Sequence, residues 1–113
     1  MELLTTLSSV GIMSNMKAIQ LVRTRITYSD IAFAELVLWQ VPRSVDGSEH
    51  RFKYRLAYVV RRKCVLRYDN ENGKGDHRHF GKHESVYKFT TPEQLITNFQ
   101  QDIARWNDEN CDP

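Results

Sequence analysis

A β-hairpin pattern stands at the centre of the chain, in residues 52–69, FKYRLAYVVRRKCVLRYD. Aromatic residues and leucine alternate with basic and small residues through the first nine positions, which is typical of a strand with one buried face. Residues 63–69 alternate in the same way, with Cys64 expected on the core side. Because only Arg61 and Arg62 separate the two runs, we predict a hairpin.

Further strands are expected on both sides of this hairpin. Residues 17–27 are rich in β-branched side chains, and residues 31–41 are apolar on both parities, as in a strand covered on both faces. The periodicity of residues 31–41 is also compatible with a helix. Residues 42–50 hold a proline and an Asp-Gly pair and predict a loop. Residues 69–84 hold three glycines and predict a long loop, followed by a short final strand at residues 85–89.

The last element is a helix with a strong N-terminal signal. Thr91 is the expected N-cap, Pro92 takes the first helical position, and Gln94 completes a capping box. Five apolar residues then share one stripe of a helix that runs to about residue 107: Leu95, Ile96, Phe99, Ile103 and Trp106. We therefore expect an α+β fold, an antiparallel meander of about five strands with one C-terminal amphipathic helix packed on the sheet.

The composition fits one small globular domain. The 113 residues are 41% hydrophobic and 27% charged, which supports a real core and leaves little room for a second domain. We expect a single domain over residues 16–110, preceded by a poorly ordered extension at residues 1–15. At this length folding needs neither metal nor disulfide, and we predict no cofactor.

The cysteine count and the hydropathy indicate a compartment. Two cysteines cannot make a disulfide framework, which favours reduced thiols and a cytoplasmic protein. No apolar run approaches the roughly 18 residues that a bilayer span needs, so no contact with a membrane is expected.

Basic residues gather in the central hairpin. The net charge is only +2, yet residues 51–67 contain seven basic residues and no acid, whereas residues 93–113 hold five acids against Arg105 alone. Such a run usually forms a solvated strand face, but its acid-free length favours contact with nucleic-acid phosphates. The predicted nucleic-acid-binding residues are Arg51, Lys53, Arg55, Arg61, Arg62, Lys63, Arg67 and Arg78.

Reactive side chains are densest in residues 69–84, which hold three of the four histidines. Imidazole can remove or donate a proton near neutral pH, and basic side chains can stabilise charge on a phosphate during transfer. This combination is typical of a metal-independent ribonuclease, in which the RNA 2′-hydroxyl attacks its own phosphate. The predicted catalytic residues are His77 and His79 for acid–base chemistry, Asp69 to orient a histidine, and Lys74 to hold phosphate.

Two other interpretations of this segment stay open. An extended His77-x-His79 pair with a neighbouring carboxylate can bind a divalent metal. The positive charges of Lys74, Arg78 and Lys82 would repel such a cation, so we predict no metal site. Alternatively, these residues only build turns, and the histidines cap nearby backbone groups.

Four segments together resemble a known family. They are WQVP at 39–42, HRFKYRLAYV at 50–59, RYDNENGKGDHRH at 67–79 and TPEQLITNFQQDIARW at 91–106. In this order they resemble the TumE family of toxin–antitoxin toxins over about residues 17–107, with residues 1–15 outside the pattern. The positions that the resemblance marks as kept by family members are Arg51, Lys53, Tyr68, Asp69, Asn70, Gly73, Gly75, His77 and His79.

The resemblance implies a bacterial toxin that a helix-turn-helix antitoxin neutralises. Combined with the basic strip and the loop histidines, it leads us to expect a toxin that acts on RNA, by metal-independent cleavage. The alternative is a non-catalytic module that binds nucleic acid or docks the antitoxin, and inhibits growth by occupying a site. An exposed edge strand would also permit a homodimer.

Overall fold

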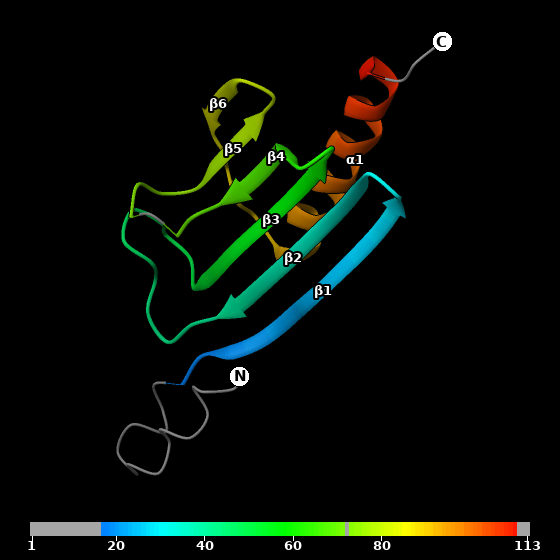
Figure 1. Ribbon diagram of the computed structural model, residues 1–113. Coiled ribbons are helices and arrows are strands. Elements are labelled where there is room, and N and C mark those ends of the chain that lie inside the picture. The colour runs from blue at the N-terminus through cyan, green and yellow to red at the C-terminus, as the bar shows by residue number, and fades with distance from the viewer. Residues whose placement is uncertain (1–16, 72, 111–113) are drawn as a thin grey trace.

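The computed structural model describes residues 17–71 and 73–110, which form one sheet and one helix. The strands are β1 (Ile19–Ser29), β2 (Ala32–Gln40), β3 (Phe52–Val60), β4 (Lys63–Asp69), β5 (His77–Phe80) and β6 (His83–Val86), and the helix is α1 (Pro92–Asn110). The strands lie in chain order across the sheet, each antiparallel to the next (Figure 1). The predicted α+β meander with one C-terminal helix is confirmed, with six strands instead of five. The predicted extension at residues 1–15 lies outside the described residues.

The segment predicted as a long loop contains a second, short hairpin. Residues 77–80 and 83–86 form β5 and β6, and Gly81 in the turn between them has a φ of 61°. Two four-residue strands built largely from polar side chains carry almost no apolar alternation, so the sequence pattern could not reveal them. The strand predicted at residues 85–89 is correct for its first two residues only, because the chain leaves the sheet after Val86.

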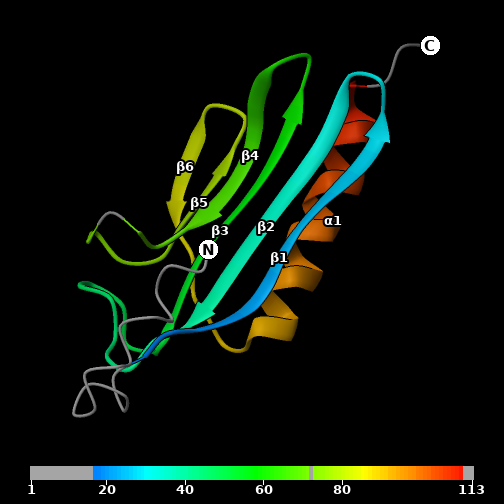
Figure 2. The same cartoon turned by 60° about the horizontal axis from the view of Figure 1, so that its bottom comes forward.

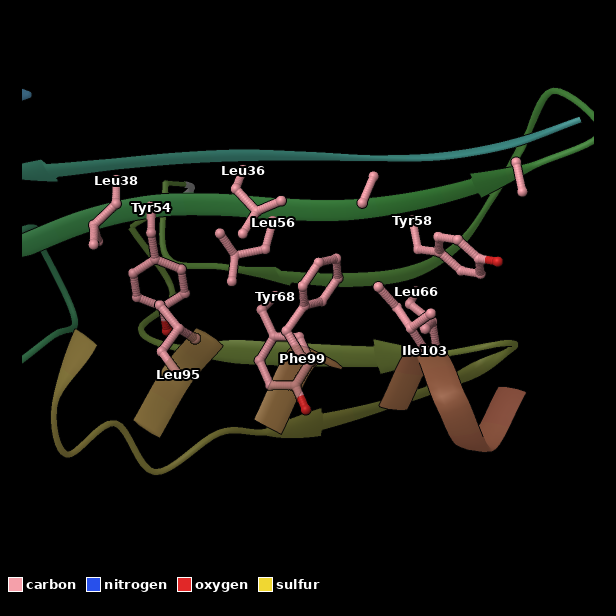
Figure 3. Close-up of a cluster of buried hydrophobic side chains, with 12 residues drawn as sticks. Leu36, Leu38, Tyr54, Leu56, Tyr58, Leu66, Tyr68, Leu95, Phe99 and Ile103 are labelled. Carbon is pink, nitrogen blue, oxygen red and sulfur yellow. The ribbon is translucent and has the colours of Figure 1, made fainter. Parts of the chain in front are cut away.

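Helix α1 covers one face of the sheet and makes the core there (Figures 1 and 2). Leu95, Phe99 and Ile103 are buried against it, and the other two residues of the predicted stripe are half-buried at its border. Figure 3 shows these side chains meeting leucines and tyrosines from β2, β3 and β4. Each such side chain contributes about 1.5–3 kcal/mol by leaving water. Because α1 packs on β3 and β4, the edge strand β1 lies beside the core instead of under the helix.

The start of α1 follows the predicted signal in part. The backbone N–H of Gln94 donates to Thr91 Oγ1 at 3.1 Å, which confirms the N-cap. The Gln94 side chain donates to Asn98 Oδ1 instead of returning to the cap, so the capping box is only half formed. The helix ends at Asn110, three residues later than expected.

Cys64 is exposed, although the alternation placed it on the core side. A β-bulge explains the difference: Tyr58 pairs with Leu66, but the next residue, Val59, pairs with Cys64. Val65 is the extra residue, and it reverses the alternation at this end of β4.

A partly buried ion pair ties α1 to the sheet. Arg78 of β5 donates from Nε to Asp102 Oδ2 at 2.7 Å and from Nη2 to Oδ1 at 2.9 Å. The Tyr68 hydroxyl donates to the same carboxylate at 2.6 Å. The bond to Asp102 raises the pKa of Arg78, and burial together with the same acceptor raises the pKa of Tyr68. The charge of Arg78 therefore has its partner inside the fold.

Removing this carboxylate charge tests the attachment of the helix. Asp102→Asn leaves the Arg78 guanidinium without a counter-charge, and we expect the free energy of unfolding to fall by about 3 kcal/mol. The matched control is Glu109→Gln, which breaks the exposed pair with Arg105 on the same helix and should cost less than about 0.5 kcal/mol. Urea unfolding followed by circular dichroism measures both; equal losses would contradict the assignment.

The buried tyrosines predict a loss of stability in alkali. Because the folded-state pKa of Tyr68 lies above its unfolded value of about 10, the folded chain retains a proton that the unfolded chain releases. The contribution of Tyr68 is therefore fully present below about pH 9 and falls as the pH rises above about 10. Urea titrations across this range should show a shallower decline for Tyr68→Phe than for the wild type. If the free energy of unfolding falls equally with pH in both proteins, Tyr68 is not the cause of the alkaline loss of stability.

Candidate functional site

The face of the sheet away from α1 carries most of the charged side chains of the strands. Strand alternation and register place on this open face one side chain in two from each strand, opposite in parity to the core residues. Its charged and aromatic members are Arg23, Arg25, Phe33, Glu35, Trp39, Lys53, Arg55, Arg67, Asp69, His77, His79 and Glu84. The described residues place no helix over this face (Figure 2).

One carboxylate of the open face stands beside both predicted catalytic histidines. Glu84 Oε2 lies 3.3 Å from His77 Nδ1 and 3.6 Å from His79 Nε2. The two histidines project from the same side of β5, about 6–7 Å apart along the strand. Sequence reasoning missed Glu84, because its position opposite His79 depends on a hairpin that the sequence did not reveal.

The hydrogen bonds give the Nε2 atoms of the two imidazoles different roles, acceptor in His79 and donor in His77. An arginine can only donate, so Arg67 Nη2, at 3.0 Å from His79 Nε2, requires a lone pair on that nitrogen. A carbonyl can only accept, so the Lys74 oxygen, at 3.0 Å from His77 Nε2, requires a proton there. His79 therefore presents an acceptor nitrogen beside a guanidinium, while His77 holds its Nε2 proton and leaves Nδ1 facing Glu84.

This cluster also holds polar atoms without hydrogen-bond partners. Among the described residues, Arg67 Nε and His77 Nδ1 are the buried side-chain nitrogens that make none. Arg67 Nε lies 3.0 Å from Asp69 Oδ2, close enough for ionic attraction but not aligned for a hydrogen bond. Unsatisfied buried groups are uncommon in folded proteins and often mark functional positions. The open-face cluster thus holds two nitrogens whose hydrogen-bonding capacity is unused.

A second histidine and carboxylate pair lies at the start of β3 and is fully satisfied. Asp76 accepts hydrogen bonds from Ser48 Oγ at 2.5 Å, Tyr54 Oη at 2.6 Å and His50 Nε2 at 2.7 Å. His50 Nδ1 accepts the Phe52 backbone N–H at 3.1 Å. Burial, with the bond to Asp76, raises the pKa of Tyr54. All partners are used, so this network joins two loops instead of forming a reactive site.

Close backbone packing completes that junction. Gly47 and Gly75 have φ values of 87° and 89°, and a Cβ atom on Gly75 would lie 2.9 Å from the Gly47 carbonyl oxygen. Asn70 donates to the Phe52 carbonyl at 2.7 Å and accepts the Tyr54 N–H at 3.0 Å. Asn70 and Gly75, both marked by the family resemblance, therefore hold the loops in place.

The predicted site residues separate into distinct groups. Lys53, Arg55 and Arg67 share the open face with the two histidines. Asp69 contacts Arg67 instead of a histidine, and Arg78 faces α1 on the other side of the sheet. Four further basic residues are exposed away from the cluster, Arg51 before β3 and Arg61, Arg62 and Lys63 at the β3–β4 turn. Lys74 is exposed before β5, and its carbonyl holds His77.

The described parts of the chain contain no group of three or more His, Cys, Asp or Glu side chains arranged to hold a metal ion. No helix within them combines the length and the apolar character that crossing a membrane requires.

Comparison with known proteins identifies a family. A family model described as Toxin TumE matches residues 9–107. The match begins at residue 9, so part of the segment expected to lie outside the family pattern belongs to it. No curated protein and no solved structure matches the chain. The matched toxin family implies an antitoxin partner. Because the match covers most of its length, this chain belongs to the TumE toxin family.

Proposed function

We propose that this chain is the toxin of a toxin–antitoxin module and that it cleaves RNA in the cytoplasm, without a metal, on the open face of its sheet. The observation that supports cleavage is the cluster of Arg67, His77, His79 and Glu84, in which neighbouring side-chain atoms lie 3.0–3.6 Å apart. These residue types supply the proton acceptor, the proton donor and the positive charge that phosphoryl transfer from RNA requires.

The proposed reaction is attack of a ribose 2′-hydroxyl on the adjacent phosphate. His79 Nε2 takes the hydroxyl proton while the bond from O2′ to phosphorus forms. The bond from phosphorus to O5′ then breaks, and His77, acting as an imidazolium protonated on both ring nitrogens, donates its Nδ1 proton to the leaving O5′ and becomes neutral. Arg67 moves from His79 to the phosphate and stabilises its additional negative charge. The products are a 2′,3′-cyclic phosphate and a free 5′-hydroxyl.

The rest of the open face offers a path for single-stranded RNA. Lys53 lies opposite Trp39 in the register between β3 and β2, and Arg55 follows on the same face. Phe33 lies further along β2, half-buried, with the Arg25 guanidinium 3.8 Å from its ring centre. Aromatic rings between basic side chains can stack bases while the cations hold phosphates. The hairpin tyrosines are buried in the core, so Phe33 and Trp39 are the aromatic candidates for stacking.

One observation favours the non-catalytic alternative, in which the toxin binds RNA without cutting it. In the structure, Arg67 Nη2 donates to His79 Nε2, the nitrogen whose lone pair the mechanism needs as a base. If Arg67 stays there when RNA binds, the same cluster acts as a phosphate clamp.

Histidine variants separate these two functions. His77→Gln and His79→Gln should each reduce cleavage of a purified single-stranded RNA by about 10²-fold or more, with EDTA leaving wild-type cleavage unchanged. His83→Gln is the matched control, since His83 is exposed on β6 and pairs with Phe80 away from the cluster. Products are resolved by denaturing electrophoresis and tested for cyclic phosphate ends. If both folded variants cleave RNA as fast as the wild type, the catalytic assignment of the histidines is wrong. If the wild type arrests growth but cleaves no RNA, the cluster acts as a phosphate clamp.

Salt dependence tests the path for RNA. Lys53→Gln and Arg55→Gln should each weaken RNA binding and reduce the slope of log affinity against log salt by about one unit or less. Arg43→Gln is the control, because Arg43 is exposed in the loop between β2 and β3. Fluorescence anisotropy with a labelled oligonucleotide measures the slopes. If Arg43→Gln reduces the slope more than the two strand variants do, RNA does not bind along the open face.

A further inference from the structure

Strand β1 is a long edge strand that carries exposed apolar side chains. It has 11 residues, and among the strands of the described residues it pairs with β2 alone. Within the described residues, the exposed large hydrophobics are Ile19, Leu21, Ile26, Tyr28, Ile31 and Val86. All but Val86 belong to β1 or to the turn after it. Natural proteins seldom leave such an edge open, because its free backbone groups template pairing with another chain.

An aromatic hollow continues this edge toward the helix. Its volume is about 460 Å³, and its lining includes Tyr28, Ile31, Tyr58 and Trp106. Tyr28 meets Tyr58 edge-on with ring centres 5.5 Å apart, and Tyr58 meets Trp106 in the same manner at 6.1 Å. The rings are therefore already ordered, and an apolar side chain of a partner can enter the space beside them.

Positive charge borders the apolar edge. Arg23 and Arg25 alternate with the apolar residues along β1, and Arg25 already pairs with Glu35 at 3.2 Å. Arg61 and Arg62 line a second hollow together with Asp30 and Ile31. The two turn arginines have φ values of 51° and 69°, a backbone region that costs a non-glycine residue of order 1 kcal/mol or more. Since the Asn-Gly pair preferred in such turns would avoid this strain, the arginines are better explained by a role for their side chains.

A second copy of this chain fits the edge poorly. Antiparallel pairing of β1 with the same strand of another copy, centred on residue 23, 24 or 25, sets an arginine opposite an arginine. Like charges directly opposite each other destabilise a strand pair. An acidic partner has the complementary charge.

We infer that β1 is the docking strand for the antitoxin, which adds an extended segment to this edge of the sheet. The inference rests on the toxin–antitoxin part of the proposed function and is independent of RNA cleavage. The added segment alternates apolar residues, which meet Ile26 and the hollow beside Tyr28, with acidic residues, which meet Arg23 and Arg25. This edge is separated from the histidines of β5 by the width of the sheet (Figure 1).

A matched pair of edge variants tests the inference. Arg23→Glu/Ile26→Thr changes the charge and the apolar contact on β1, and Lys82→Glu/Val86→Thr makes the same changes at the opposite edge. Calorimetry with the antitoxin that restores growth should give a Kd about tenfold or more higher for the β1 variant. The control variant should stay within about twofold of the wild type. In cells the β1 variant should arrest growth even when the antitoxin is co-expressed.

Each other outcome overturns the inference. A folded β1 variant that the antitoxin binds and neutralises like the wild type excludes β1 as the docking strand. Loss of RNA affinity with unchanged antitoxin affinity assigns the edge to RNA. A wild-type dimer that becomes monomeric in the β1 variant, by light scattering, assigns it to a second copy. Hydrogen exchange in the complex gives a check without substitution, since the amides of β1 should gain protection.

The same experiments distinguish a failure of the proposed RNA cleavage from a failure of the docking inference. If purified protein cuts no RNA but the β1 variant escapes the antitoxin, the docking strand stands and the catalytic assignment falls. If RNA is cut and both edge variants are neutralised alike, the catalytic assignment stands and the docking strand falls.

Discussion

The contact of Arg78 with Asp102 determines which side of the sheet is available for chemistry. Side chains alternate along β5, so turning Arg78 toward α1 turns its two neighbours, His77 and His79, to the open face. Tyr68 on β4 shares the same carboxylate and holds this strand in the same orientation. A pair that ties α1 to one face of the sheet thus turns the two histidines to the other face.

The protein has two groups of histidine and carboxylate side chains, and they differ in how completely their polar atoms are hydrogen-bonded. Asp76 has three side-chain donors and lies buried, so His50 is held in one state by partners on both ring nitrogens. Glu84 is half-exposed and lies beside two imidazoles without a hydrogen bond to the buried His77 Nδ1. A satisfied network resists change because any lost bond leaves a buried group unpaired. In the open-face cluster, by contrast, Arg67 Nε and His77 Nδ1 have no hydrogen bond to lose.

Local patterns in the sequence predicted the fold, but they predicted only part of the candidate site. The hairpin at residues 52–69 and the cap at Thr91 follow from alternation and from side-chain hydrogen bonding over three residues, which a sequence displays directly. The partners of His77 and His79 depend on β5 and β6, which pair through their register with β4 and not through apolar content of their own. Glu84 was missed for that reason. The role of Asp76 was missed because its partners, two in the β2–β3 loop and one on β3, lie 22–28 residues away in the sequence.

An antitoxin that docks at β1 can inhibit a site on β5 only if part of it also extends across the open face. Neighbouring strands lie about 4.8 Å apart, so four steps from β1 to β5 span about 19 Å, too far for one added strand to shield the histidines. The open face between them presents Lys53 and Arg55 on β3 and Arg67 on β4. An acidic segment continuing from the docked strand along this row would occupy the positions that the phosphates of RNA need. Inhibition would then arise from competition for the row, and the edge strand would supply the affinity that makes the competition effective.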